Sequence, residues 1–242
     1  MNRPRLVTRR KAIITGLASL GGLLLPGCSR PTPPNYGNIL RMGDNFTYIA
    51  QRTLLPGQTL AREYNFRDIS SMPATGTTNP AKFSEDYERH LHNSFADWKL
   101  EIEGKVSMPG LYSLADLQKF PSRTQITKHF CEEGWTAIAQ WTGVPLGTIL
   151  QSAGIMESAR FVNFHTYDDW ADSIDLVDAF HPQTLLAYGM NGKNLPVAHG
   201  APVRLRVEKQ IGYKSFKYIK KISVTEEFYD QGDIGWAWYN GI

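Results

Sequence analysis

The stretch Ser122–Leu146, SRTQITKHFCEEGWTAIAQWTGVPL, carries Cys131, one of the two cysteines in the chain. Residues Thr124–Phe130 alternate polar and apolar side chains and include β-branched Ile126 and Thr127, which predicts a half-buried strand ending at the cysteine. Two glutamates and Gly134 then end the pattern, so the thiol would lie at a strand-to-loop junction, where it can face a cavity. This position suits a metal ligand or a nucleophile. The alternative is a small buried apolar side chain.

The residues around the cysteine resemble a known family. Cys131–Trp135, CEEGW, followed by Trp141–Leu146, WTGVPL, resembles the segment of the sulfite oxidase superfamily in which a cysteine thiolate binds the molybdenum of a molybdopterin cofactor. Blocks between His181 and Lys217 are similar to the C-terminal half of that family's cofactor domain. The resemblance, over residues 98–225, implies an α+β fold of β-rich mixed sheets with short helices. A thiolate is also a soft ligand that suits a transition metal.

The same resemblance implies the residues of the site. Cys131 is expected to be the metal ligand and catalytic residue, and the molybdopterin phosphate is expected to contact Ser215, Phe216 and Lys217. Further cofactor contacts are implied at Asn79, Thr166, His199 and Arg204.

The residues themselves give separate arguments at three of these places. Gly212–Lys217, GYKSFK, offers backbone N–H groups, a hydroxyl and ammonium groups to one small volume, as a buried phosphate requires. The alternative for Lys214 and Lys217 is a pair of solvated surface charges. Arg204 would add a planar fork of donors for phosphate or pterin oxygens. For Asn79, the alternative is a turn asparagine that bonds its own backbone before a proline.

Polar residues at the end of the strand predicted at Arg160–Tyr167 are further candidates. His165 is expected to be a surface residue on the other face of this strand, because side chains alternate along it. Asp168 and Asp169 are adjacent and would point in different directions, so only one of them could act in a pocket.

The remaining pattern predicts short elements typical of a mixed sheet. Ser113 is expected to cap a helix that ends before Pro121. A second helix is expected at Pro145–Ala153, with Gly154 after its end. Strands are expected at Trp98–Val106, Pro202–Val207 and Lys221–Thr225, and a hairpin turn at Asn191–Gly192.

The N-terminus predicts export. Residues 1–30 combine a basic start, an apolar run and a small-residue end, as in a signal segment, and Arg9 and Arg10 resemble a twin-arginine motif. Cleavage near Cys28 and lipid attachment to Cys28 remain alternative outcomes. A Pro-rich linker, residues 31–37, and a single domain, residues 38–242, would follow in the periplasm.

Composition excludes nucleic acid as a partner. The formal charge is +3, but five of the 26 Lys and Arg lie within the first eleven residues, and the rest of the chain is slightly acidic. A content of 42% hydrophobic residues is that of an ordinary globular domain. The chain has no C-x-x-C-H haem motif, so another protein would exchange electrons with the site, by analogy a membrane cytochrome.

The residues after the cysteine predict the substrate class. Sulfite-oxidising members of the family place arginines there, whereas this chain has Glu132 and Glu133, which would repel an anion. The expected reaction is oxygen-atom transfer from a neutral S-oxide such as methionine sulfoxide, as in periplasmic methionine sulfoxide reductase catalytic subunits. Sulfite oxidation is the alternative if basic residues reach the site; they are Arg160, Arg204, Arg206 and Lys209. A second alternative is a non-catalytic exported binding domain.

Overall fold

The computed structural model describes residues 46, 49–50, 53–54 and 59–228, which all belong to one compact unit, Arg41–Ile242. The predicted export signal, Cys28 and the Pro-rich linker lie outside the described residues. Within the described residues, no helix is both long and apolar enough to cross a membrane.

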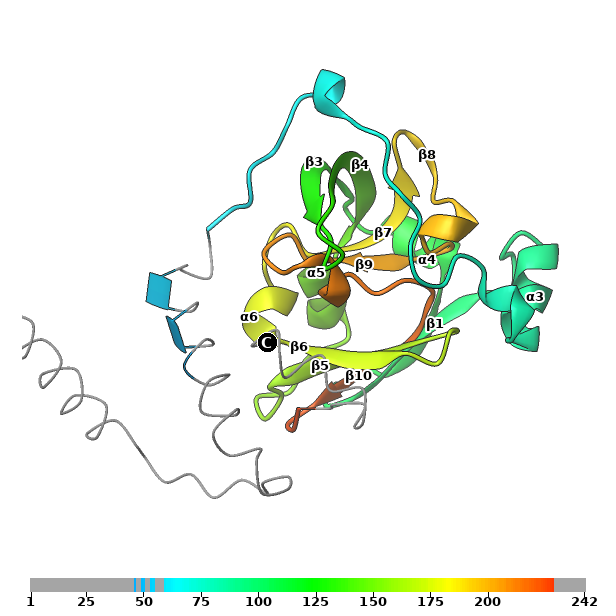
Figure 1. Ribbon diagram of the computed structural model, residues 1–242. Helices are drawn as coiled ribbons and strands as arrows, with labels where there is room; N and C mark the ends of the chain where they lie inside the picture. Colours follow the sequence, from blue (N-terminus) through cyan, green and yellow to red (C-terminus); the bar gives the residue numbers. More distant parts are fainter. Residues whose placement is uncertain (1–45, 47–48, 51–52, 55–58, 229–242) are drawn as a thin grey trace, which may run out of the picture. The chain divides into compact units, whose positions relative to one another are not determined.

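One five-stranded sheet, called the first sheet, has the strand order β2, β1, β10, β5, β6. Figure 1 labels β1, β10, β5 and β6 of this sheet. β1 pairs with β10 in parallel, with Glu101 opposite Lys221, and the other neighbours are antiparallel. The strands are β1 Lys99–Gly104, β2 Gly110–Ser113, β5 Phe161–Thr166, β6 Ala171–Asp175 and β10 Ile219–Thr225.

The second sheet contains β3, β4, β7 and β8 in that order, and β9 also pairs with β7. The β3–β4 hairpin pairs Phe130 with Thr136, so Cys131–Trp135 forms its loop. Asn191 and Gly192 have φ of 51° and 75° between β7 and β8, which confirms the predicted hairpin turn. The strands are β3 Arg123–Phe130, β4 Thr136–Pro145, β7 Leu185–Met190, β8 Lys193–Asn194 and β9 Arg204–Arg206.

The helices are short. Ser113 caps α4 in a capping box with Asp116, as predicted. Pro145 is the N-cap residue of α5 rather than its first helical residue, and Gly154, with φ of 70°, follows the helix. The α-helices are α3 Glu85–His92, α4 Leu114–Lys119, α5 Leu146–Ser152 and α6 Leu176–Ala179, and the 3-10 helices are η1 Phe66–Asp68, η2 Pro80–Lys82, η3 Val197–His199 and η4 Gly212–Lys214.

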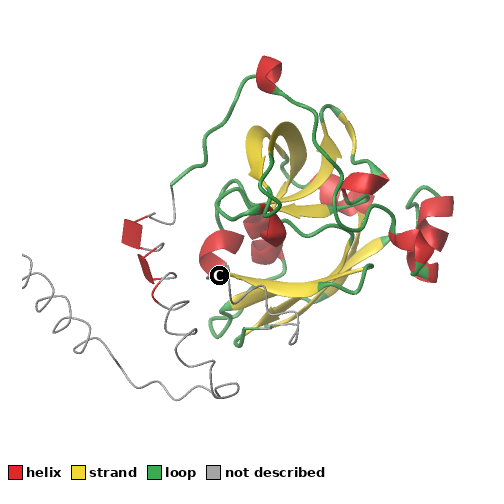
Figure 2. Ribbon diagram, in the orientation of Figure 1, coloured by secondary structure: helices red, strands yellow, loops and turns green. Residues whose placement is uncertain are grey.

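The main hydrophobic core includes side chains from both sheets and from α5. The two groups of strands and the helices between and beside them are seen in Figure 2. Alternate residues of each strand contribute, because a pleated strand turns every second side chain to one face. The core includes Leu100, Ile102, Phe164, Ile222, Val224, Val144, Leu186, Leu205, Ile149 and Leu150, all fully buried. The α+β class with mixed sheets and short helices is confirmed.

An extended segment before the first strand, residues 59–77, lies against the second sheet; it is called the strap. Its backbone N–H groups donate at Ala61 to Gln183 Oε1 (2.7 Å), at Tyr64 to Ile126 O (2.8 Å), and at Ser70 to Ile138 O (2.9 Å). The strap is cyan in Figure 1. Two of these bonds attach the strap to β3 and β4.

Candidate functional site

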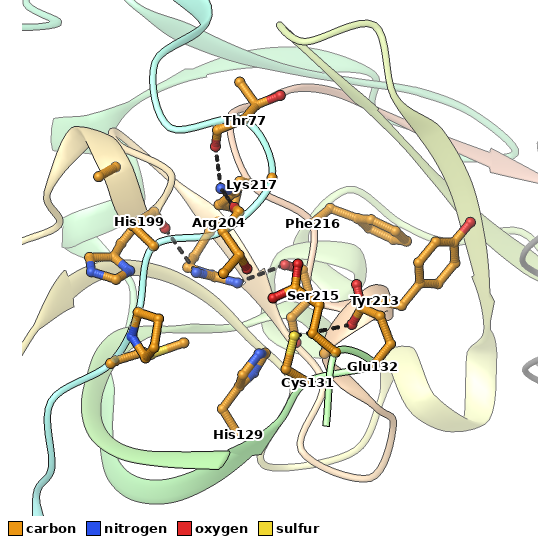
Figure 3. A pocket seen from close by; sticks show the side chains of 18 of the residues that line it. Thr77, His129, Cys131, Glu132, His199, Arg204, Tyr213, Ser215, Phe216 and Lys217 are labelled. Carbon is orange, nitrogen blue, oxygen red and sulfur yellow. Dashed lines mark hydrogen bonds between the residues drawn. The ribbon is translucent and has the colours of Figure 1, made fainter. Parts of the chain in front are cut away.

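A cavity of about 430 Å³ lies where the strap, the β3–β4 loop, the β5–β6 turn and the C-terminal segments meet (Figure 3). Seven of the eight predicted site residues line it: Cys131, Thr166, His199, Arg204, Ser215, Phe216 and Lys217. The remaining lining residues are Met72–Thr77, His129, Glu132, Glu133, Trp135, Asp168, Trp170, Ala198, Gly212 and Tyr213.

Cys131 occupies the first position of the β3–β4 loop. Its N–H donates to Trp135 O at 3.0 Å, and its carbonyl accepts from Gly134 N–H at 3.1 Å, so the loop is closed on itself. The thiol is partly exposed. Burial, with an added contribution from the charge of Glu132, raises the pKa of the Cys131 thiol. A nearby metal cation would be needed to hold it as a thiolate at neutral pH.

Two carboxylates flank the thiol. Glu132 Oε2 lies 3.6 Å from Cys131 Sγ, and Glu133 Oε2 accepts from Trp135 Nε1 at 2.9 Å. Both glutamates are exposed and line the cavity. The mouth beside the cysteine is therefore acidic.

The opposite wall carries Arg204, a buried cation. Its Nη1 donates to His199 O at 2.9 Å and its Nη2 to Ser215 O at 2.8 Å (Figure 3). Among the described residues no carboxylate forms an ion pair with it. Burial and the neighbouring Arg206 lower the pKa of Arg204 to about 9. The guanidinium is thus a buried positive charge without an ion-pair partner in the described part of the chain.

Lys217 is the second cation of this wall. Its Nζ donates to Thr75 O at 2.8 Å and to Thr77 O, both in the strap. Burial, and then Arg204, lower the pKa of Lys217 to about 8. Gly200 has φ of 108°, and a Cβ there would meet Lys217 Cβ at 3.0 Å and Arg204 Cβ at 3.1 Å. Glycine is required here because the two cationic side chains approach its backbone.

The other predicted residues are held by local bonds. Ser215 Oγ accepts a hydrogen bond from Val207 N–H at 3.3 Å. The ring of Phe216 packs against that of Phe164 with the centroids 5.4 Å apart. Thr166 Oγ1 lies 2.5 Å from Asp168 Oδ1 and closes the β5–β6 turn. Burial, followed by the charge of Arg204, lowers the pKa of His199, so its ring is neutral at pH 7.

Asn79 is the predicted contact that the structure does not bring to the cavity. Its Oδ1 accepts from Ala81 N–H at 3.0 Å and caps η2. Asn79 therefore has the turn role that was its alternative, because an asparagine before proline can bond its own backbone.

Lys214 departs from both expectations for it. Its Nζ lies 3.0 Å from Asp172 Oδ2, and the two side chains are 1% and 3% exposed. Lys214 is therefore neither a solvated surface charge nor a residue that lines the cavity. Through this ion pair Lys214 ties the segment that contains Ser215 to strand β6.

The other polar residues at the end of β5 separate as predicted. Asp168 lines the cavity, whereas Asp169 has a side chain that is 90% exposed and lies near Lys220. His165 Nε2 lies 3.4 Å from Ser223 Oγ on the neighbouring β10, and His165 does not line the cavity.

Sequence reasoning missed His129, Trp170 and Tyr213. His129 is 7% exposed, and burial together with the charge of Arg206 lowers its pKa to about 2. The available signal was its position two residues before Cys131 on a strand, which places both side chains on one face. The rings of Trp170 and Tyr213 pack edge to face with their centroids 5.5 Å apart. Trp170 lies in the β5–β6 turn and Tyr213 in the three-residue helix η4, segments too short for a periodic pattern to mark them.

Comparison with known proteins gives the same cofactor domain. A family model described as "Oxidoreductase molybdopterin binding domain" matches residues 88–232. A protein-methionine-sulfoxide reductase subunit of Azospira oryzae, named YedZ1, is 34% identical over 96% of this chain and 87% of its own length. The protein-methionine-sulfoxide reductase catalytic subunit of Xanthomonas axonopodis is 29% identical over 90% of this chain and 70% of its own length.

A solved structure shares the fold. The sulfane dehydrogenase SoxCD from Paracoccus pantotrophus superposes with a TM-score of 0.52 at 23% identity. The match covers 55% of this chain and 39% of the SoxCD chain, so this chain spans well under half of that relative.

The cavity fits molybdopterin with molybdenum. Arg204 and Lys217 place two positive charges at its wall. The charge of Asp168 favours the charged form of Lys217, but no carboxylate of the described residues forms an ion pair with either cation, and a buried charge is costly unless it is compensated. An anionic phosphate would compensate both. Cys131 offers one soft ligand from the other side, and no cluster of three His, Cys, Asp or Glu among the described residues competes for the metal.

Proposed function

This chain belongs to the family of molybdopterin-binding oxidoreductases, and we propose that it reduces a neutral S-oxide, first of all methionine sulfoxide, with a molybdenum–molybdopterin cofactor. In the overall reaction the S–O bond breaks, two electrons reduce the sulfur, and two protons leave with the oxygen as water. The cofactor, when bound, supplies the two-electron redox chemistry and the site of oxygen transfer.

The chain's own residues divide the work of holding the cofactor. Cys131 would bind the metal, while Arg204, Ser215 and Lys217 would bind the phosphate through charge-assisted hydrogen bonds. Trp135 and Tyr213 line the remaining wall and would exclude water from the substrate. Support for the substrate comes from relatives named as methionine sulfoxide reductase subunits.

One observation carries the choice of a neutral substrate: Glu132 and Glu133 lie at the mouth beside the thiol. Each would repel an incoming anion by about 1–3 kcal/mol at the dielectric of a protein surface. Sulfite is an anion and an S-oxide is not.

Two arginines considered for sulfite binding are occupied elsewhere. Arg160 donates to the carbonyls of Glu157 and Ala159, and Arg206 is paired with Glu208. Neither lines the cavity, and neither does Lys209. Arg204 alone of the four does, and its place beside Lys217 suits the cofactor phosphate.

The test is turnover with a chemical electron donor. Purified protein should reduce methionine sulfoxide and oxidise sulfite poorly, and the double variant Glu132→Gln, Glu133→Gln should raise sulfite oxidation by about tenfold or more without changing sulfoxide reduction much. Efficient sulfite oxidation by the unmodified protein would establish the alternative reaction. A protein that contains no molybdenum would point to the non-catalytic binding domain.

The metal ligand has its own test. Cys131→Ser should retain the fold and lose activity by more than about a hundredfold, because a hydroxyl is a poorer ligand for this metal than a thiolate. Far-UV circular dichroism checks the fold, and sulfoxide turnover checks the activity. Full activity in the serine variant would remove Cys131 from the site.

Electron supply and location are part of the same proposal. The relatives are named as subunits, which supports a partner protein, and a membrane cytochrome in the periplasmic system is the partner we propose. Replacing Arg9 and Arg10 by lysine should leave precursor in the cytoplasm if export uses the twin-arginine route. Mass spectrometry of the exported protein would distinguish lipidated Cys28 from cleavage nearby.

A further inference from the structure

A buried chain of polar side chains runs from β9 to the cavity, next to Cys131. Arg206 and Glu208 form a two-bond ion pair, with Nε to Oε1 at 3.1 Å and Nη2 to Oε2 at 2.9 Å, and both side chains are 1% exposed. The remaining nitrogen, Nη1, lies 2.8 Å from His129 Nδ1 and 3.5 Å from Ser215 Oγ. This series, Glu208–Arg206–His129, is called the relay.

The relay fixes which ring nitrogen of His129 carries the proton. A guanidinium has only donors, so His129 Nδ1 must accept, and the proton of the neutral ring is then on Nε2. Glu208 is held in turn by Gln125 Nε2 at 3.1 Å, and the Arg206 guanidinium lies over the Trp141 ring at 4.5 Å. The fork of Arg206 therefore has one orientation.

The Nε2 edge of His129 is open to the cavity. Among the described residues none accepts a hydrogen bond from it, and the buried nitrogens without a partner in this part of the chain are those of Trp98 and Trp141. His129 Nε2 is thus unpartnered but not sealed off. A Cβ at Gly212 would lie 2.5 Å from His129 Nε2, so glycine keeps this edge clear.

We propose that His129 donates its Nε2–H bond to the bound cofactor beside Cys131, and that Arg206 and Glu208 are positioning residues that hold the ring in this state. The cofactor carries oxygen and sulfur acceptors, and a neutral donor that cannot turn would select one orientation of it.

The ring state is tested directly by ¹⁵N nuclear magnetic resonance of the holoprotein at pH 7, with the His129 signals assigned by their loss in His129→Gln. We expect a proton on Nε2 and none on Nδ1. The double variant Arg206→Met, Glu208→Gln leaves no unpaired buried charge, and it should give a mixture of both tautomers. A proton on Nδ1 in the unmodified protein would overturn the relay.

Cofactor binding is tested by molybdenum content after prolonged dialysis. The molybdenum content of His129→Phe should be lower than that of the unmodified protein by about tenfold or more. His129→Gln keeps a hydrogen-bond donor, so its molybdenum content should fall distinctly less. Lys128→Met is the matched control, because Lys128 precedes His129 on the same strand and its ammonium group lies over the rings of Tyr64 and Phe130, which are not part of the relay. Equal molybdenum in His129→Phe and in the unmodified protein would refute the donor role.

Both readouts are independent of sulfoxide turnover. The inference rests on the cofactor of the family and not on the choice of substrate, so a protein that failed to reduce sulfoxides could still retain molybdenum through His129.

Discussion

Two sets of buried cations lie close together in this protein and differ in their partners. Arg206 and Lys214 each face a buried carboxylate, Glu208 and Asp172, whereas Arg204 and Lys217 face backbone carbonyls and the cavity. The first set is electrically complete without a ligand and ties loops to strands. The cations of the second set have no carboxylate partner among the described residues, which marks them as the part of the protein that binds an anionic ligand. Burial alone does not distinguish a structural cation from a ligand-binding one, because both sets are buried. The distinction is whether a carboxylate forms an ion pair with the cation.

The largest effect should come from breaking a complete pair. Lys214→Met would leave Asp172 as an unpaired buried acid and should lower the unfolding free energy by about 3–5 kcal/mol. Urea unfolding of the cofactor-free protein measures it. Adding Asp172→Asn should restore much of the loss, and a single variant as stable as the unmodified protein would show that the pair is not structural.

An incomplete cation should respond in the opposite way. Arg204→Met removes charge-assisted hydrogen bonds to the cofactor of about 1.5–3 kcal/mol, roughly a tenfold to hundredfold loss of retention, and should change the stability of the cofactor-free protein little. Molybdenum content and urea unfolding, measured on one preparation, separate the two quantities. Equal molybdenum in variant and unmodified protein would mean that Arg204 does not bind the cofactor.

The pH dependence of stability sharpens the comparison for Lys217. Its pKa is about 8 in the folded chain and 10.5 in the unfolded chain, so between these values the unfolded chain holds more protons and stability must rise with pH. Between pH 8 and pH 10 the cofactor-free protein should gain about 2 kcal/mol relative to Lys217→Met. Taking the difference between the two proteins cancels the contribution of groups that titrate equally in both. A flat difference would show that Lys217 is solvated.

The smallest effect should come from a pair that is complete but exposed. Arg123 and Glu63 have side chains that are 33% and 40% exposed, and such surface pairs contribute about 0–1 kcal/mol. Arg123→Met should therefore leave both unfolding free energy and molybdenum content nearly unchanged. A loss comparable to that of Lys214→Met would contradict the role given to burial.

The sequence predicted the elements whose signals are local. The strand that delivers Cys131 showed clear alternation, and α4 was marked by the Ser113 and Asp116 cap. β4 was missed although Ala137, Ala139 and Trp141 alternate as buried residues, because two small alanines give a weak hydrophobic signal. α3 was missed because only Tyr87 and His90 of its eight residues are buried.

Site residues were predicted where the sequence matches the family motif. They were missed where contacts between distant parts of the chain determine the position of a side chain. Cys131, Arg204 and Ser215–Lys217 lie in matched blocks and do line the cavity. Lys214 is next to Ser215 in sequence, yet its partner Asp172 is on another strand, and no pattern in one chain reveals such a pair. His129 likewise depends on Arg206, 77 residues away.

The parallel pairing of β1 with β10 bears on how the protein is made. Glu101 finds its partner Lys221 only after about 120 further residues have been synthesised, on the order of 10 s at bacterial rates of translation. The strap is similarly separated from Lys217, which bonds Thr75 and Thr77. Neither the first sheet nor the cavity wall can be completed while these late residues are still unsynthesised. The ribosome must therefore release nearly all of the domain before a complete cofactor-binding site exists.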